Sequence, residues 1–208
     1  MKKNIIIWGL ISLVSVFVIS ACKGGQNVKE EEVVEEIDYT ALVEQELPSV
    51  EDFVKTVDVF QKGTSDLLPT GKVWDNGEQS IRELLEPLNF TVERDTERFF
   101  ISASKNCQFI TKCENYIYSY AIDSVKTEGL AAACYFESMG DFYVKGEILL
   151  ADTCVYDAYV ERIKATGYEP TVNDFADTED EEKYVLGDYY FKCSRQQKRI
   201  SLHYEQVF

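Results

Sequence analysis

Apolar residues recur at helical spacing in three segments of the chain. Residues 49–63, 75–87 and 153–166 place aliphatic and aromatic side chains three and four positions apart. This spacing is typical of amphipathic helices that pack one face on a core. Serine or aspartate residues at the start of each segment can cap a helix N-terminus. The expected caps are Ser49 with Asp52, Asp75 with Glu78, and Asp152 or Thr153.

Beyond the second predicted helix, the apolar period changes to two. Residues 99–103 and 116–122 alternate apolar and polar side chains, which predicts strands with one buried face. Residues 131–148 indicate a hairpin, and residues 183–208 indicate a second one that closes the chain. The expected cross-strand neighbours in the closing hairpin are Tyr189 and Phe191 on one strand and Ile200, Leu202 and Tyr204 on the other.

Together these segments predict an α+β fold in which an antiparallel β-sheet packs against two or three helices. Two internal matches indicate a tandem repeat of a helix followed by strands. Residues 80–90 match 158–168 at an offset of 78, and residues 99–105 match 189–195 at an offset of 90. The layout resembles that of β-lactamase-inhibitor-like and PepSY-like periplasmic domains, and the resemblance concerns layout only. A single α+β sheet without a repeat is the alternative.

The N-terminus has the three parts of a secretory signal: two lysines, an apolar run over residues 5–19, and small residues before Cys22. The run is shorter than the roughly 20 residues that a membrane-spanning helix needs, so we expect cleavage. The quartet Ile19-Ser20-Ala21-Cys22 resembles the lipobox of bacterial lipoproteins. This resemblance implies that residues 1–21 are a signal peptide and that Cys22 is lipidated as the first mature residue. An ordinary cysteine after an ordinary signal peptide is the alternative.

The residues after Cys22 divide into a tether and a domain. By resemblance to enterobacterial lipoproteins, Lys23 in place of an aspartate favours the outer membrane. Residues 22–47 are acidic with a single aromatic residue, so we expect a flexible, extended tether. Residues 48–208 are long enough to form one globular domain with its own core.

The charge of the chain excludes several partners. Its 21 basic and 37 acidic side chains give a formal net charge of −16, and removal of residues 1–21 takes away two lysines and no acid, which leaves −18. Such a chain repels nucleic-acid phosphates and anionic membrane surfaces. We therefore expect no nucleic-acid partner, and a lipid on Cys22 as the membrane anchor.

Catalytic and metal-binding side chains are few. His203 is the single histidine, so a histidine-dependent triad or metal site must use it, and we expect it to face solvent from a strand. Cys107 and Cys113 are close enough along the chain for a disulfide, with free thiols as the alternative. Buried, unreactive thiols are expected at Cys134, Cys154 and Cys193.

Acidic and aromatic clusters complete the candidate features. Residues 173–182 contain six carboxylates, but their spacing does not match a calcium loop, so we interpret them as a solvated acidic loop. We expect no metal and no cofactor. The chain has 13 tyrosines and 12 phenylalanines. Tyrosines on strands suit a protein interface or stacking on a sugar, although core packing explains most of them.

These observations favour a non-enzymatic, lipid-anchored envelope protein that binds a protein partner, either an envelope component or a secreted enzyme, at the outer membrane or cell surface. The second hypothesis is a lipoprotein that binds a glycan or another small ligand, and the third is an extracytoplasmic enzyme. Two or three coplanar rings beside a groove would favour glycan binding. A cleft that holds His203 or carboxylates with shifted pKa values would favour an enzyme.

Overall fold

The computed structural model describes seven parts of the chain, all within the compact unit Ile37–Phe208: residues 37–63, 71–96, 100–114, 117–125, 132–138, 144–171 and 180–204. The helices are α1 (Tyr39–Glu46), α2 (Val50–Gly63), α3 (Gly71–Leu85), the 3₁₀ turn η1 (Glu86–Leu88) and α4 (Thr153–Ala165). The strands are β1 (Thr91–Asp95), β2 (Phe100–Lys105), β3 (Cys107–Glu114), β4 (Ile117–Val125), β5 (Ala132–Ser138), β6 (Val144–Leu150), β7 (Glu169–Thr171), β8 (Glu181–Leu186), β9 (Tyr189–Ser194) and β10 (Arg199–Tyr204).

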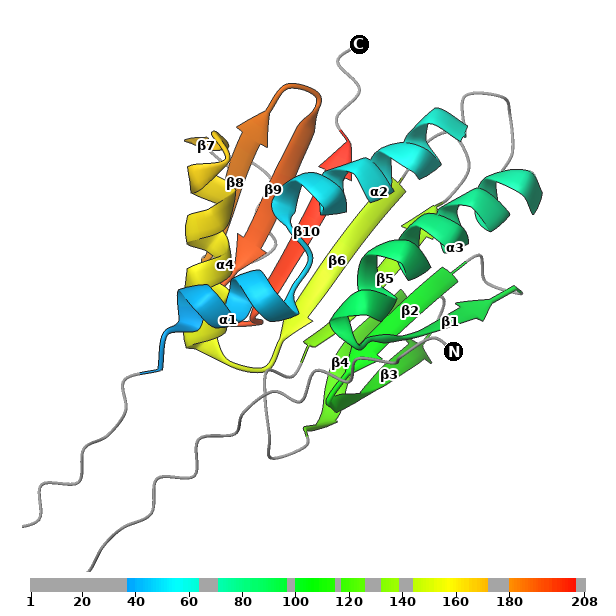
Figure 1. The fold of residues 1–208 in the computed structure, drawn as a ribbon, viewed down its shortest axis with the longest axis horizontal. Coiled ribbons are helices and arrows are strands. Elements are labelled where there is room, and N and C mark those ends of the chain that lie inside the picture. Colours follow the sequence, from blue (N-terminus) through cyan, green and yellow to red (C-terminus); the bar gives the residue numbers. More distant parts are fainter. Residues whose placement is uncertain are drawn as a thin grey trace, which may run out of the picture. The chain divides into compact units, whose positions relative to one another are not determined.

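Eight of these strands form one antiparallel sheet, in the order β1-β2-β5-β6-β10-β9-β8-β7. The four α-helices lie in front of this sheet in Figure 1. Strands β3 and β4 form a separate two-stranded sheet. The predicted α+β class, an antiparallel sheet packed against helices, is confirmed, and α1 is a helix that the sequence pattern did not predict.

The strand order has approximate twofold symmetry about the β6–β10 pair. Helix α3 is followed by β1, β2, β5 and β6, and α4 is followed by β7, β8, β9 and β10, so each unit runs from an edge of the sheet to its centre. This arrangement is the predicted tandem repeat. The symmetry relates β2 to β8. Residues 189–195 contain the next strand, β9, so the predicted match of residues 99–105 with 189–195 is wrong by one strand. The reason is that Phe99-Phe100 and Tyr189-Tyr190 are alike in sequence, whereas the place of a strand in the sheet is set by its pairing.

Two of the three predicted helices have the expected caps. The hydroxyl of Ser49 accepts a hydrogen bond from the backbone N–H of Asp52 at 3.1 Å, at the start of α2. The carboxylate of Asp152 accepts one from the N–H of Cys154 at 2.6 Å, at the start of α4. Gly167 follows α4 with φ of +94°, a backbone conformation that favours glycine at the end of a helix.

Helix α3 begins earlier than the sequence pattern indicates. It starts at Gly71, so Asp75 and Glu78 lie inside the helix and not at its cap. There both carboxylates pair with the guanidinium of Arg94 on β1, at 2.9 and 3.1 Å. These ion pairs join the helix to the first edge strand of the sheet.

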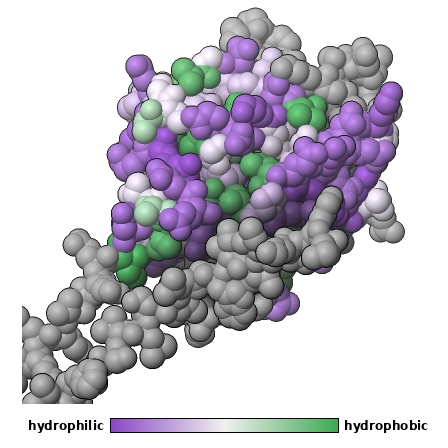
Figure 2. All heavy atoms as spheres, in the orientation of Figure 1, coloured by the Kyte–Doolittle hydropathy of each residue, from purple (hydrophilic) through white to green (hydrophobic). Residues whose placement is uncertain are grey.

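The core lies between the helices and the sheet. The rings of Phe53 on α2 and Phe136 on β5 pack with centroids 5.4 Å apart. Gly146 lies where β6 passes under α2, and a Cβ atom there would approach Val57 Cγ2 to 2.8 Å. Figure 2 shows the helix side of the molecule, where the described surface is mainly hydrophilic with separated apolar areas. The large apolar side chains therefore point inward to the sheet.

The folded unit starts before residue 48. Val43 and Leu47 belong to the buried core, and the guanidinium of Arg162 on α4 donates a hydrogen bond to the carbonyl of Val43 at 3.0 Å. Residues 37–47, predicted as part of the tether, are thus part of the domain. The sequence pattern missed this because a helix of eight residues has little stability of its own and depends on tertiary packing.

Candidate binding site on the sheet

One face of the main sheet packs on the helices, and we call the opposite one the distal face. Phe136 points toward Phe53 of α2, so its strand neighbour Tyr135 points to the distal face because side chains alternate along a strand. The strand registers align distal-face residues in rows across the sheet. One row is Ser102, Tyr135, Glu147, Ser201, Lys192 and Lys183. The next row is Phe100, Glu137, Lys145, His203, Tyr190 and Val185.

The β3–β4 hairpin covers the half of the distal face that belongs to the first unit. The ring of Tyr120 stacks on Tyr135 with centroids 4.1 Å apart, and on Phe100 at 5.2 Å. Phe109 lies over the same two residues, with centroids 6.2 and 6.5 Å away. The hydroxyl of Tyr120 also donates a hydrogen bond to Glu137 at 3.3 Å. This aromatic stack holds the hairpin against the sheet.

A groove of about 240 Å³ lies between the hairpin and strands β1 and β2. Phe100 and Phe109, whose ring planes differ by 10°, both line it. The other lining residues are Thr91, Glu93, Arg94, Asp95, Ser102, Ser104 and Thr111. Hydroxyls and carboxylates beside aromatic rings are suited to a sugar. The two rings stack on each other, however, and do not lie side by side as an exposed platform.

Beyond β5, the distal face carries a group of cations and one histidine, which we call the cationic patch. It consists of Lys145, Lys183, Lys192, Arg199 and the imidazole of His203, on the four adjacent strands β6, β8, β9 and β10. Lys145 lies directly opposite His203 across the β6–β10 pair, and Lys183 lies opposite Lys192 across the β8–β9 pair. Three carboxylates pair with these cations: Glu137, which lies 3.7 Å from Lys145, together with Glu147 and Glu181. The four cations therefore outnumber the acids by one in a chain whose net charge is −16.

Two buried carboxylates lie among these cations. Glu147 is 1% exposed, and its Oε2 atom is 2.9 Å from Lys145 Nζ. Glu181 is 8% exposed and lies 3.6 Å from Lys192 Nζ and 3.8 Å from Arg199 Nη2. Charges with so little water around them interact more strongly than exposed ones, and removal of one partner is costly. These ion pairs therefore hold the ammonium and guanidinium groups in fixed positions.

His203 lies beside Lys145 in one row of the patch, next to the row of Lys192 and Lys183. Its ring stacks on Tyr190, with centroids 5.0 Å apart and planes 10° from parallel. Burial, followed by the nearby charges of Lys145, Lys192, Arg199 and Lys183, lowers the pKa of His203 to about 3. The expectation of a solvent-facing histidine is therefore wrong. The strand turns this residue away from the helices, and its side chain is half-buried on the distal face, stacked on Tyr190.

The expected disulfide between Cys107 and Cys113 is not formed in the structure. Cys107 has a free thiol, which donates a hydrogen bond to the carbonyl of Ala132 at 3.1 Å. Both cysteines belong to strand β3. Six residues of extended strand span roughly 20 Å, whereas the Cα atoms of a disulfide lie about 4–7 Å apart. A turn between the two residues would have allowed the bond, but β3 is extended here, with only a local irregularity between Gln108 and Phe109.

The other described thiols follow the prediction in two of three cases. Cys134 and Cys193 are buried, and burial raises the pKa of each thiol well above its ordinary value. Cys154 is exposed, so the prediction of a buried thiol there is wrong. The reason is its place in the first turn of α4, one residue before the buried side chain of Val155.

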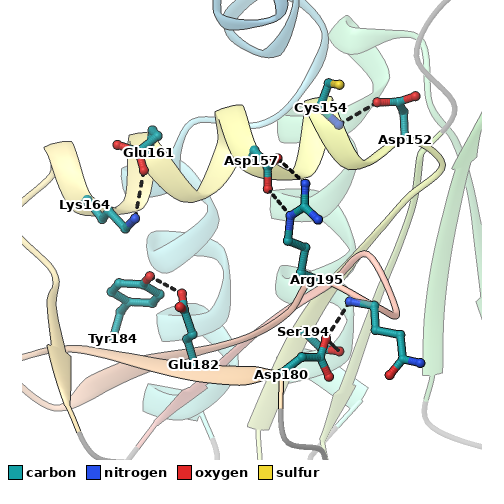
Figure 3. Close-up of polar contacts among 11 residues, drawn as sticks. Asp152, Cys154, Asp157, Glu161, Lys164, Asp180, Glu182, Tyr184, Ser194 and Arg195 are labelled. Carbon is teal, nitrogen blue, oxygen red and sulfur yellow. Dashed lines mark hydrogen bonds and ion pairs between the residues drawn. The ribbon is translucent and has the colours of Figure 1, made fainter.

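The end of the predicted acidic loop is ordered. Residues 172–179 lie outside the described parts of the chain, but Glu181 and Glu182 belong to strand β8. Figure 3 shows Asp180 accepting a hydrogen bond from the backbone N–H of Gln196, at 2.5 Å, and Tyr184 donating one to Glu182. The interpretation as a solvated loop is thus wrong for residues 180–182, because side chains and backbone groups of the sheet bind their carboxylates.

The lipobox with Cys22 lies outside the described residues. In the parts that the structure describes, no helix has the length and apolar character to cross a membrane. In the same parts, no three His, Cys, Asp or Glu side chains are grouped so that they could hold a metal ion. A comparison with family models, with curated proteins and with solved structures finds no match for this chain.

Sequence reasoning missed the cationic patch. Its four cations are spread over residues 145–199 and meet only because β6 pairs with β10 in the centre of the sheet. One signal was present: the predicted strands around Lys145, Lys183 and Lys192 each carry a lysine at a position that alternates with buried apolar residues. Such positions share a face once the strands are adjacent.

Proposed function

We propose that this chain is a non-enzymatic lipoprotein, anchored through Cys22 to the outer membrane or cell surface, and that its distal face binds a protein partner. The observation that carries the binding function is the cationic patch over β6, β8, β9 and β10. There, aromatic and charged side chains lie on a face of the sheet that the four helices do not cover. Tyrosine and arginine, both present on this face, are enriched at protein interfaces.

The state of His203 supports binding over catalysis. A general base works best when its pKa is near the operating pH. The pKa of His203 is lowered to about 3 by burial and by four cations, so its imidazole would be a weak base at neutral pH. Its stacking on Tyr190 further restricts its access to a substrate.

A lipid on Cys22 is testable by fractionation. We expect the full chain to sediment with membranes and its Cys22→Ser variant to be recovered in the soluble fraction. Intact mass of the mature protein should show acyl chains on the residue that follows Ala21. Equal membrane recovery of the two proteins, or an unacylated mature form, would refute the anchor.

Partner binding is testable by crosslinking in intact envelopes. We expect the wild-type chain to capture a protein that a Lys183→Gln/Lys192→Gln variant captures poorly. A Lys55→Gln/Lys72→Gln variant, which has the same net charge but changes exposed residues of α2 and α3, is the matched control. Equal capture by all three chains would contradict a role of the patch.

The groove beside the hairpin supports glycan binding as a second candidate function. Phe100 and Phe109 lie there next to hydroxyl groups of Ser102, Ser104 and Thr111. Recovery of polysaccharide in place of protein, reduced by Phe109→Ala and unchanged by substitution of the cationic patch, would favour this function.

A further inference from the structure

We infer that the cationic patch binds a carboxylate-rich segment of a partner protein. The inference rests on the proposed protein-binding function and gives the chemistry of the partner. It is carried by the juxtaposition of Lys145, Lys183, Lys192 and Arg199 around the stacked rings of His203 and Tyr190.

The balance of charge at this site is opposite to that of the whole protein. Acidic side chains outnumber basic ones by 37 to 21 in the chain, yet the four cations here outnumber the three carboxylates that pair with them, Glu137, Glu147 and Glu181. An acidic segment is repelled by most of the surface and attracted here. Complementary charge of this kind directs a partner to one site and fixes its orientation.

The spacing of charges in the patch favours carboxylates on a peptide over a dense polyanion. Glu147 and Glu181 separate the cations, at 2.9 Å from Lys145 and 3.6 Å from Lys192. A polyphosphate would bring negative charge against these two carboxylates as well as against the cations. An extended peptide with acidic residues at alternate positions presents charges about 7 Å apart on one side, so it can reach cations while avoiding both glutamates.

Aromatic rings beside the cations provide the apolar part of the contact. Tyr190 stacks on His203 at 5.0 Å, and the ammonium of Lys183 lies 4.2 Å from the centroid of Tyr190. The imidazole of His203 is uncharged at neutral pH because its pKa is low, so its flat ring can serve as an apolar contact. Rigid rings give contact area at little cost in conformational entropy, so side chains between the acidic residues of a partner can pack on this pair.

The first unit of the repeat already shows how such a face is covered. Between β2 and β5 it inserts the β3–β4 hairpin, whose Phe109 and Tyr120 lie over the distal face. Between the equivalent strands of the second unit, β8 and β9, the connection is the two-residue turn of Gly187 and Asp188. The distal face of the second unit is therefore the place that a segment of another protein can cover in the same way.

The test uses the full chain in a neutral detergent and a fluorescent peptide of alternating glutamate and alanine. We expect the peptide to bind, and Lys183→Gln/Lys192→Gln to weaken binding by about tenfold or more. The control Lys55→Gln/Lys72→Gln should change it less than about twofold, since exposed charges outside a binding site contribute little. Near-UV circular dichroism checks folding, and Arg199→Gln serves as a second variant if the double variant unfolds.

Four outcomes would overturn the inference. The first is absence of peptide binding, and the second is an equal loss of peptide binding in the patch and control variants. The third is stronger binding of polyphosphate than of the peptide. The fourth is about tenfold tighter peptide binding when Glu30, Glu31 and Glu32 are replaced by glutamine. The last would show that the acidic N-terminal segment of the chain itself occupies the patch. Failure of these assays with protein capture intact would refute only the carboxylate chemistry, whereas loss of capture would refute the proposed function.

Discussion

Tyr120 of the β3–β4 hairpin stacks on Tyr135 of the main sheet, with ring centroids 4.1 Å apart and ring planes 26° from parallel. These two residues belong to different sheets, so their contact fixes where the hairpin lies. The hydrogen bond from the hydroxyl of Tyr120 to Glu137 adds a polar contact at the same point.

We predict that Tyr120→Ala destabilises the domain by about 2 kcal/mol, because it removes a half-buried ring and its stacking partners. Hydrogen exchange should rise over β3 and β4 more than over β6 and β10. Ser119→Ala, at the exposed neighbouring position, is the control and should leave both measurements unchanged. Uniform exchange across all strands would argue against the stack as the main attachment of the hairpin.

The buried ion pair of Lys145 and Glu147 provides a second prediction. Glu147→Leu leaves the ammonium of Lys145 without its close partner at 2.9 Å, and the loss in free energy of unfolding should be about 3 kcal/mol. The double variant Lys145→Met/Glu147→Leu should recover part of this loss, because it removes both charges of the pair but takes the cation away from Glu137, which lies 3.7 Å from Lys145 Nζ. Urea unfolding of the four proteins in this cycle measures the coupling.

An exposed pair of similar length is the control for that cycle. Glu161 and Lys164 on α4 are 2.8 Å apart, with side-chain exposures of 71% and 43%. Glu161→Leu should change stability by less than about 1 kcal/mol, as is usual for surface ion pairs. A similar coupling energy for both pairs would show that burial is not what strengthens the pair in the sheet.

The single histidine permits a direct test of the cationic patch. The pKa of His203 is lowered to about 3, so its imidazole resonances should not shift between pH 8 and pH 5. In urea the same resonances should titrate near pH 6.5, the ordinary value. Lys192→Gln should raise the pKa of the folded state, and Lys55→Gln should not. A midpoint near pH 6 in the folded wild type would contradict the proposed surroundings of His203.

The same shift predicts how stability depends on pH. Because the pKa of His203 is lower in the folded state than in the unfolded one, the unfolded state binds more protons below about pH 6.5. The free energy of unfolding contributed by this residue is present above that pH and is lost as pH falls toward 3. His203→Asn should therefore flatten the fall in stability between pH 7 and pH 5.5, measured by urea unfolding.

Gly146 gives a prediction about the packing of α2 on β6. A Cβ atom at this position would lie 2.8 Å from Val57 Cγ2 and 2.9 Å from Phe53 Cζ. Gly146→Ala should therefore cost about 1–3 kcal/mol, since overpacking a filled core forces side chains to move. Gly71→Ala is the matched control, because a Cβ there meets no atom within 4 Å. A lower melting temperature for the Gly71 variant alone would contradict this account.

Local patterns were sufficient to predict much of the fold. The capping box of Ser49 and Asp52 and the apolar spacing that follows it define α2, and the alternation around Phe191 and Leu202 correctly predicts that these residues pair across β9 and β10. Such elements depend on residues close together in the chain. The predicted layout of two helix-then-strand units is correct for the same reason, because each unit is built mainly from neighbouring segments.

Features that depend on distant residues were missed. Alternation predicts β4 as a strand, but only its contact with Tyr135 shows that it lies on the distal face and outside the main sheet. Lys145 and His203 come together through the pairing of β6 with β10, two strands about fifty residues apart in the chain. Sheet order is set by the packing of the whole domain, and no short segment of sequence encodes it.

The position of β10 has a consequence for biosynthesis. This strand comes last among the described elements, yet it is hydrogen-bonded on both sides, to β6 and to β9. Until this strand has been synthesised and has docked, the two halves of the sheet each present a bare inner edge and cannot join. Closure of the domain therefore waits for the last of the described strands, and a chain truncated before β10 should expose two inner sheet edges that can pair with other chains.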